Sequence, residues 1–353
     1  SGPVLLGAGM TLSTLDAEGT GSVLHLSGGR VSGFTLTGGS ANIGGAIWVI
    51  GGSPEIDHNL LWGNEARDFG SGIDVDGASV SAWIHHNVLW ENVDSDLGHA
   101  GDPHGIQVRG ATPVIEHNLI GRGDSNGLLF SGSSDPVIRN NIFFENGIPT
   151  VRGRGICALS VNPGTIVHNL FHGNAIAAIL VQNPSITDQT AQEANDADPG
   201  DQIYGNLDGD PLFADADAMD WELLYGSPAI DAGDPGSPLD PDGTTADIGP
   251  FFFDQSVASV GPPGLPFTVT RAYPNPFSGA TRVDLAGDGP AEVWVADVTG
   301  RRVRTLRTGA SGGDERVEWD GRDHRGNPAV SGVYFLVVQS GGRTHLTRVI
   351  KLR

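Results

Sequence analysis

One short phrase recurs through the first half of the chain and constrains its fold more than any other feature. Ile-x-His-Asn stands at residues 56–59, 84–87, 115–118 and 166–169, and residues 138–141 carry the variant Ile-Arg-Asn-Asn. The intervals between the final asparagines are 28, 31, 23 and 28 residues, which is too irregular for helical or propeller repeats of fixed length. A solenoid whose rungs share one corner but carry loops of variable length accommodates this pattern.

A second asparagine follows the phrase by five residues in most rungs, at Asn64, Asn92, Asn146 and Asn174. Asparagine tolerates the left-handed backbone of a sharp corner, and its amide can bond to the asparagine of the next rung. We therefore predict asparagine ladders along the corners of a parallel β-helix. Since no single rung can bury its own apolar face, the rungs must stack into one continuous core.

The composition fits an all-β protein that is rich in turns. The chain has 53 glycines and 22 prolines among 353 residues, 18% of its residues are charged, and glycine shows no three-residue collagen period. Cys157 is the only cysteine, so neither an intramolecular disulfide nor a site of several thiolates can form. No run of 18 apolar residues predicts a membrane span.

The sequence predicts four segments. Residues 1–187 hold the β-helix repeats, and residues 188–260 form an acidic segment that we expect to cap the last coil. Residues 261–266 are a Pro/Gly linker, which can continue neither a helix nor a central strand. Residues 267–353 alternate short strands with Gly-rich turns, as in a small β-sandwich. Because the chain opens in what looks like mid-repeat sequence with no signal peptide, we expect a trimmed N-terminus with further coils before Ser1.

The charge is unevenly distributed between these segments. The formal net charge of the chain is −22. Residues 1–266 contain 7 Lys+Arg and 33 Asp+Glu and have a net charge of −26, whereas residues 267–353 have a net charge of +4. Such a surface repels nucleic acid and anionic lipid, so neither is expected as a partner. It either serves solubility or attracts cations, among which carboxylates favour calcium.

Three parts of the chain resemble known families. Residues 31–37 and 44–47 are typical of secreted right-handed parallel β-helix proteins, the superfamily that includes pectate lyases, and residues 210–249 resemble the closing module that follows such helices. Residues 273–277 and 319–334 are similar to the immunoglobulin-like module of flagellar hook-cap proteins and of type IX secretion sorting domains. The resemblance implies a right-handed parallel β-helix followed by an immunoglobulin-like β-sandwich, in a secreted protein displayed at the bacterial cell surface.

Alternation along the Gly-rich strands predicts one candidate site. With Ile47, Ile73 and Ile106 pointing inward, the outward positions of neighbouring rungs become polar. The predicted substrate-binding group consists of Trp48, Asp74, Asp76 and Gln107, with Arg109 beside them. An aromatic ring next to carboxylates and an arginine suits a saccharide. The alternative is an ordinary ladder of ion pairs.

The segment Asp102-Pro103-His104 resembles the Asp-Pro-His motif of mannuronan epimerases, although Gly105 follows where that family has an acid. The resemblance implies that His104 transfers a proton at C5 of a uronate. Such chemistry needs a base, a second proton donor or acceptor and a cation that neutralises the developing enolate. Asp102, His104 and Arg109 are the predicted catalytic residues.

Two further columns accompany the repeats. We expect the histidines of the Ile-x-His-Asn phrase, His58, His86, His117 and His168, to serve structure more than to bind metal, because Asn140 interrupts them. The column Trp62, Trp90, Phe144 and His172 packs in the core if it points inward and forms a strip for sugar rings if it points outward. We favour the core.

Asp240, Asp242 and Asp247 lie around a glycine turn and have the oxygen-rich character of a calcium site, although they lack the spacing of an EF-hand. No organic cofactor is expected. The sequence thus favours a surface β-helix protein that binds a polysaccharide along one face. The alternatives are a calcium-assisted lyase or C5 epimerase, and a non-catalytic adhesin or assembly subunit that associates with itself or with a cell-surface partner.

Overall fold

In the computed structural model, the described residues are 2–95, 104–148, 152–160, 164–182, 186–197, 202–255, 268–269, 272, 274–275, 277–286, 288–297, 301–312, 315–340 and 343–352. The chain divides into two compact units, residues 1–255 and 256–353. The linker predicted at 261–266 lies outside the described residues.

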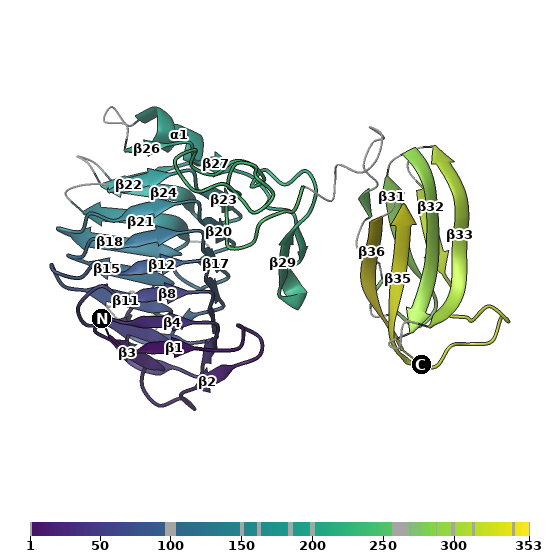
Figure 1. Ribbon diagram of the computed structural model, residues 1–353, viewed down its shortest axis with the longest axis horizontal. Helices are drawn as coiled ribbons and strands as arrows, with labels where there is room; N and C mark the ends of the chain where they lie inside the picture. The colour runs from purple at the N-terminus through teal and green to yellow at the C-terminus, as the bar shows by residue number, and fades with distance from the viewer. Residues whose placement is uncertain are drawn as a thin grey trace. The chain divides into compact units, whose positions relative to one another are not determined.

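The first unit is a parallel β-solenoid with three long sheets, which confirms the predicted fold (Figure 1). Sheet A consists of β1 (Val4–Leu6), β4 (Arg30–Ser32), β8 (Glu55–Asp57), β12 (Trp83–His85), β16 (Val114–Glu116), β19 (Val137–Arg139), β22 (Thr165–Val167) and β26 (Ile203–Tyr204). Sheet B consists of β2 (Thr14–Asp16), β5 (Thr35–Thr37), β9 (Leu60–Trp62), β13 (Val88–Trp90), β17 (Leu119–Gly121), β20 (Ile142–Phe144), β23 (Leu170–His172) and β27 (Leu207–Asp208).

Sheet C contains the Gly-rich strands. Along the chain, each rung begins with a strand of sheet C and continues with a strand of sheet A and then a strand of sheet B. Sheet C consists of β3 (Leu24–Leu26), β7 (Ile47–Val49), β11 (Ile73–Asp76), β15 (Ile106–Arg109), β18 (Leu128–Gly132), β21 (Arg154–Ser160), β24 (Ala177–Gln182) and the antiparallel β25 (Ile186–Gln189). A short side sheet consists of β6 (Ser40–Ile43), β10 (Glu65–Phe69) and β14 (Val93–Asp94).

The middle residue of each short strand in sheets A and B points into the solenoid. Ile56, Ile84 and Ile115 of sheet A and Leu61 and Leu89 of sheet B are among the buried residues of one continuous apolar core. The inward column predicted for sheet C belongs to the same core. Each of these side chains packs against its counterparts in the rungs above and below, as a stacked repeat requires.

The corner between sheets A and B is built by two residues with separate tasks. The left-handed backbone falls on the histidine of the phrase, with φ near 50° at His58, His86, His117 and His168 and 56° at Asn140. The prediction that the following asparagine adopts this conformation is therefore wrong. Turning the chain one residue earlier directs the asparagine inward, where its amide can bond along the stack.

The predicted asparagine ladder is present at that corner. Asn59, Asn87, Asn118, Asn141, Asn169 and Asn206 are buried, and each Nδ2 donates to the Oδ1 of the next member at 3.0–3.1 Å. The backbone N–H of each member donates to the same oxygen. The ladder thus pairs polar groups that would otherwise be buried without partners. At the next corner Asn64 donates to Asn92 and Asn146 donates to Asn174 in the same way, and Gly123 stands in place of asparagine on the rung between these pairs.

Helix α1 (Ala191–Ala197) ends the first ladder with an asparagine of its own. Asn206 Nδ2 donates to Asn195 Oδ1 at 3.1 Å, and Asn195 Nδ2 donates to the Asn206 carbonyl at 2.9 Å. The helix begins with a capping box, since Glu193 accepts from the Thr190 N–H at 2.9 Å and the Glu193 N–H donates to Thr190 Oγ1 at 3.2 Å. This helix therefore covers the last rung and closes its hydrogen bonds.

The remainder of the first unit folds back along the side of the solenoid. Residues 210–255 contain β28 (Phe213–Asp215), the 3-10 helix η1 (Ala216–Ala218) and β29 (Asp220–Leu223), and Trp221, Leu223 and Ile248 pack against outward residues of sheet B. Figure 1 shows this segment beside β20 and β23. The sequence predicted that residues 188–260 cap the last coil. Within this segment α1 covers the last coil, the rungs continue to Asp208, and residues 210–255 cover the apolar outer face of sheet B.

The second unit packs two antiparallel sheets around its own core. One sheet contains β30 (Thr268–Val269), β31 (Thr281–Ala286) and β34 (Glu315–Trp319), and the other contains β32 (Asp288–Asp297), β33 (Arg302–Gly312), β35 (Gly332–Ser340) and β36 (Arg343–Lys351). Trp319 lies in this core with ring centroids 5.3 Å from Phe277 and 4.9 Å from Tyr334. The strands predicted for residues 267–353 are present, among them those that contain residues 293–295, 317–319 and 333–338. Among the described residues, no helix has the length and apolar character needed to cross a membrane.

Candidate functional site

The group predicted on sheet C comes together in the expected register. Asp74 pairs with Trp48 on one side and with Gln107 on the other, and Asp76 pairs with Arg109. However, Asp74 is fully buried, and Gln107 is buried with its Oε1 accepting from the Gly70 N–H at 3.2 Å. These two side chains therefore support the protein itself and face no solvent.

Arg109 is held by both aspartates of this group. Its Nη2 lies 2.9 Å from Asp74 Oδ2 and 3.2 Å from Asp76 Oδ2, and its guanidinium lies 4.1 Å from the centroid of the Phe69 ring. Burial raises the pKa of Asp74 to about 6, against the opposing hydrogen bonds from Arg109. Trp48 is half-buried, and its ring lies edge-on to His25 at 5.2 Å. The arrangement corresponds to the ion-pair ladder that the sequence left as the alternative.

His104 is enclosed, unlike a base that must reach a substrate. It is 1% exposed, its Nδ1 lies 2.9 Å from Ser125 Oγ, and its Nε2 has no hydrogen-bond partner in the described part of the chain. Burial, and then the nearby Arg152 and Arg154, lower the pKa of His104 to about 3. Asp102, the third predicted catalytic residue, lies outside the described residues. The described geometry gives no support to proton transfer by His104 and Arg109.

The predicted calcium residues lie near one another but hold backbone groups. Asp247 accepts from the N–H groups of Asp231 and Phe253 at 2.7 and 2.6 Å, and Asp242 accepts from the Gln255 N–H at 2.8 Å. Asp240 Oδ2 accepts from the Asp247 N–H at 2.9 Å. Burial and then the carboxylate of Asp247 raise the pKa of Asp240 to about 6. Calcium at these three residues stays a prediction.

The aromatic column on sheet B points outward yet is covered. Trp90 is 1% exposed and Phe144 is buried, with the Trp90 ring 5.3 Å from Trp221 of the folded-back segment. Trp62, nearer the N-terminal end, stays 38% exposed and donates from Nε1 to Glu91 at 3.2 Å. Both sequence alternatives are therefore partly correct, because this column faces outward and most of it is packed.

The outer face of sheet A carries an exposed aromatic residue that the sequence analysis missed. Trp83 is 44% exposed, its Nε1 donates to Glu116 Oε1 at 2.7 Å, and its ring lies 4.0 Å from that of His85. Alternation around the buried isoleucine of the Ile-x-His-Asn phrase could have identified it, because that alternation places Trp83 outward. We call Trp83, Glu55, His85, Glu116, Arg30 and Arg139 the Trp83 platform.

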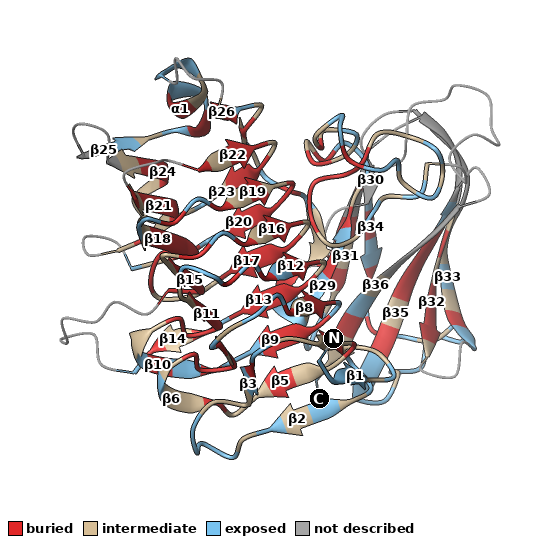
Figure 2. Cartoon of the chain, turned by 60° about the vertical axis from the view of Figure 1, so that its left-hand side comes forward, coloured by how far each residue is buried: buried red, intermediate tan, exposed pale blue. Residues whose placement is uncertain are grey.

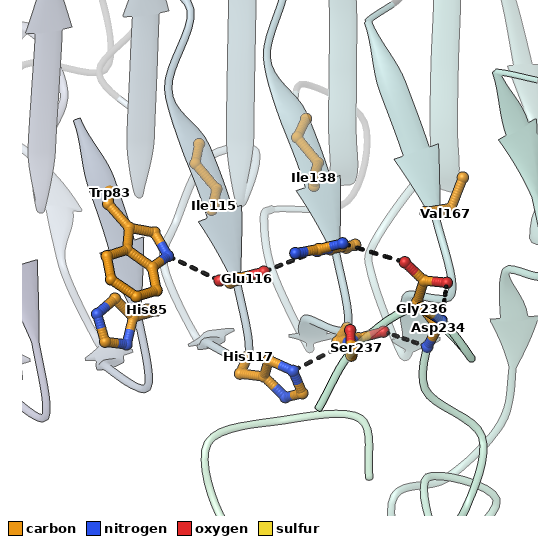
Figure 3. Close-up of polar contacts among 12 residues, drawn as sticks. Trp83, His85, Ile115, Glu116, His117, Ile138, Val167, Asp234, Gly236 and Ser237 are labelled. Atoms are coloured by element: carbon orange, nitrogen blue, oxygen red, sulfur yellow. Dashed lines mark hydrogen bonds and ion pairs between the residues drawn. The ribbon is translucent and has the colours of Figure 1, made fainter. Parts of the chain in front are cut away.

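Ion pairs fix the charged members of the Trp83 platform. Arg139 Nε donates to Glu116 Oε2 at 2.7 Å, and its Nη1 reaches Asp234 at 3.2 Å, so hydrogen bonds run from Trp83 to the folded-back segment (Figure 3). On the other side, Arg30 lies 3.4 Å from Glu55 and donates to both oxygens of Asp57 at 2.7 Å. The platform is therefore arranged before any ligand arrives.

Among the described residues, one group of side chains could hold a metal ion, and Arg30 already forms ion pairs with its carboxylates. Glu55, Asp57 and His85 each place a ligand atom within 4.8 Å of the others. Burial alone would raise the pKa of Asp57, but hydrogen bonds from Arg30, His58 and Ser32 outweigh it and lower this pKa to about 2. With both oxygens of Asp57 engaged, the group suits an ion-pair network.

Comparison with protein families identifies the architecture of both units. Residues 22–190 match the right-handed β-helix region. Residues 275–343 match the FlgD Ig-like domain. The β-helix match includes strands of all three long sheets of the first unit, and the Ig-like match covers most of the second unit. The resemblances noted for the repeats and for the tail are confirmed, and the one noted for residues 210–249 stays a prediction.

Likenesses to known proteins beyond these families cover little of the chain. No curated protein matches it. Latent dimeric PorU from Porphyromonas gingivalis is 22% identical over 25% of this chain and 9% of its own, with a TM-score of 0.21. PorZ, an essential bacterial surface component of the type IX secretion system of the same organism, is 31% identical over 24% of this chain and 11% of its own, with a TM-score of 0.19.

Proposed function

We propose that this protein is a bacterial cell-surface β-helix that binds a polysaccharide on the outer face of sheet A. The observation that carries the proposal is the exposed ring of Trp83, set among charged side chains that are already paired. An aromatic face offers apolar contact to the C–H face of a sugar ring, and the surrounding carboxylates and guanidinium groups can bond to its hydroxyls.

The Trp83 platform supports binding without a large ordering cost. Glu116 fixes one edge of the indole and the ring of His85 packs against it, so few side-chain rotamers are lost when a ligand arrives. Val114, Val137 and Thr165 continue the column of Trp83 on the following strands. At a strand spacing of about 4.8 Å, the four side chains form a strip about 14 Å long, enough for an extended chain.

The charge of the protein selects the class of glycan. A net charge of −22 disfavours a polyuronate and leaves neutral or cationic polysaccharides as ligands. The cell-surface location is supported by the match of residues 275–343 to the FlgD Ig-like domain. The resemblance of this tail to type IX secretion sorting domains implies export and display. Secretion and surface attachment through this tail are part of the proposal.

The test is affinity electrophoresis of the full chain in gels that contain neutral, anionic or cationic polysaccharides. We expect a neutral or cationic polysaccharide to retard the protein, and Trp83→Ala to weaken retention about tenfold, corresponding to roughly 1.4 kcal/mol. Trp62→Ala is the matched control, because it removes another exposed indole of the solenoid. Equal retention of wild type and Trp83→Ala, or no retention in any gel, would refute the proposal.

The same gels separate the alternatives. Each gel is run once with calcium and once with a chelator. Loss of retention of the protein in the gels that contain the chelator would support the predicted calcium site. Each polysaccharide is also incubated with the protein in solution and followed for absorbance of unsaturated products. Product formation would place the protein among the lyases instead.

A further inference from the structure

The histidine column borders a cavity that the Trp83 platform does not use. The folded-back segment approaches the corner between sheets A and B without filling it, and leaves a cavity of about 620 Å³. His58, His86 and His117 line one side of it. We call this cavity the histidine pocket. Its size is that of a site for a small organic molecule, and it is far larger than a metal ion.

The histidine wall consists of stacked rings. Ring centroids are 5.1 Å apart between His58 and His86 and 5.0 Å apart between His86 and His117, with interplanar angles of 5° and 12°. Burial, and then the neighbouring His117 and His58, lower the pKa of His86 to about 3. The low pKa of His86 leaves the middle ring of the stack uncharged at pH 7.

Hydrogen bonds fix His117 in its neutral form. The Asp234 N–H donates to Asn140 Oδ1 at 2.7 Å, which identifies the other amide atom of Asn140 as the donor nitrogen. That nitrogen lies 2.9 Å from His117 Nε2, so Nε2 must accept and carries no proton. Asn140, which interrupts the histidine column in the sequence, therefore holds the last ring of the pocket neutral.

The opposite wall is acidic and aromatic. The lining of this wall consists of four carboxylates and three phenylalanines, namely Glu222, Asp240, Asp247, Asp254 and Phe251, Phe252 and Phe253. None of the described lining residues is lysine or arginine. The uncharged rings of His86 and His117 place no positive charge opposite these carboxylates. A cation between the two walls would gain hydrogen bonds from carboxylates and the attraction of aromatic faces.

The geometry favours an organic cation over a metal. A metal needs several donor atoms that converge, and among the described residues the group that does so lies on sheet A, with no member in this pocket. The stacked rings spread their nitrogen atoms along the corner. An ammonium group on a larger molecule needs no such convergence, because its three N–H donors can reach separate oxygens.

We propose that the histidine pocket binds an organic cation through a protonated amine. The amine bonds to the carboxylates of Glu222, Asp240 and Asp254, and the carbon skeleton lies along the stacked histidines. The site does not depend on the proposed glycan function. It adjoins the Trp83 platform through the side chains of His85 and His86, whose Nδ1 atoms lie 3.0 Å apart.

Isothermal titration of the full chain with three probes tests the proposal. Spermidine carries amines without a sugar ring, the glucosamine trimer carries amines on sugar rings, and the N-acetylglucosamine trimer has the same rings without the charge. We expect spermidine and the glucosamine trimer to bind at pH 7 and binding of both to weaken when salt is raised. Binding of neither cationic probe would overturn the proposal.

Two double variants locate the site. Glu222→Gln with Asp254→Asn removes two carboxylates from exposed positions of the pocket and should weaken spermidine binding at least tenfold. Glu18→Gln with Glu65→Gln makes the same change of net charge at exposed residues elsewhere on the solenoid and should leave binding unchanged. Equal weakening by both variants would mean attraction to the overall charge alone and would refute the pocket.

Two further measurements keep the outcomes distinct. Trp83→Ala should leave spermidine binding unchanged, so failure of the glycan proposal and failure of this one are seen separately. Titration with Zn²⁺ or Ca²⁺ alone should show no binding that the Glu222→Gln, Asp254→Asn variant removes. A metal that binds in a manner sensitive to this variant, while spermidine does not bind, would contradict the assignment to an amine.

Discussion

Two neighbouring faces of the solenoid place tryptophans outward with opposite results. On sheet B, Trp90 is sealed under the folded-back segment, whereas on sheet A Trp83 stays exposed. Figure 2 shows β13, the strand of Trp90, in the colour of buried residues. The strands on both faces have three residues with the middle one inward, and the faces differ in the neighbours of the tryptophan. Outward neighbours on sheet B, such as Val88 and Leu119, are apolar and need a cover. Those on sheet A, such as Glu116 and Arg139, pair with one another and tolerate water.

An outward aromatic residue is therefore a candidate for ligand binding only when its outward neighbours are polar and can stay in contact with water. Substitutions on either face test this difference. The largest effect is expected on the covered face.

Trp90→Ala should destabilise the first unit by about 3–5 kcal/mol, because it removes a buried indole from between Phe144 and Trp221. Urea unfolding followed by circular dichroism measures the change. A loss below about 1 kcal/mol, within the range of surface substitutions, would mean that the folded-back segment does not seal sheet B.

Asn118→Ala should cost about 2–4 kcal/mol at the corner that joins the two faces. It leaves the buried N–H of Asn87 without its acceptor and removes the Nδ2 that donates to the Ile84 and Glu116 carbonyls, and each unpaired buried group costs about 1–3 kcal/mol. Asn195→Ala, at the end of the same ladder, should cost less, since α1 can admit water there. The same urea unfolding compares the two, and an equal loss would show that the ladder is not cooperative.

Trp83→Ala should change stability by less than about 1 kcal/mol, because the indole is half exposed and loses one hydrogen bond. The variant should melt close to wild type while its glycan retention falls. If its destabilisation approached that of Trp90→Ala, Trp83 would be a structural residue like its counterpart on sheet B.

The last comparison concerns pH and two buried aspartates that each face an arginine. The pKa of Asp57 is lowered to about 2, so its stabilising contribution is present above pH 3.8 and is lost as pH falls towards 2. The pKa of Asp74 is raised to about 6, so its contribution is present below pH 3.8 and is lost as pH rises through 6. The free energy of unfolding is measured across pH 2–7. Asp57→Asn should remove its pH dependence between pH 2 and 3.8, and Asp74→Asn should remove it between pH 3.8 and 6. If each variant changed the other pH range instead, the described ion pairs would be contradicted.

The fold could be predicted from the sequence because it rests on local repetition. The Ile-x-His-Asn phrase determines the solenoid, and the alternation of sheet C gives the register of Trp48, Asp74 and Gln107 correctly. The conformation of the corner was assigned to the wrong residue, since the sequence does not show whether His58 or Asn59 turns the chain.

The site was harder to predict because exposure depends on distant chain. Alternation places Asp74 outward, but it cannot show that Arg109 and Phe69 enclose it. It cannot show either that residues 210–255 return over Trp90 and leave Trp83 exposed. The histidine pocket arises from the same return of the chain, which no repeat in the sequence indicates.

Hydroxyl-radical footprinting of the full chain with a retained polysaccharide tests the central claim most directly. Oxidation of each tryptophan is measured by mass spectrometry at increasing glycan concentration. The account predicts that Trp83 becomes protected as the glycan saturates the protein, while Trp62 is oxidised at its original rate. Unchanged oxidation of Trp83 at saturation, or protection of Trp62 in its place, would contradict the assignment of binding to sheet A.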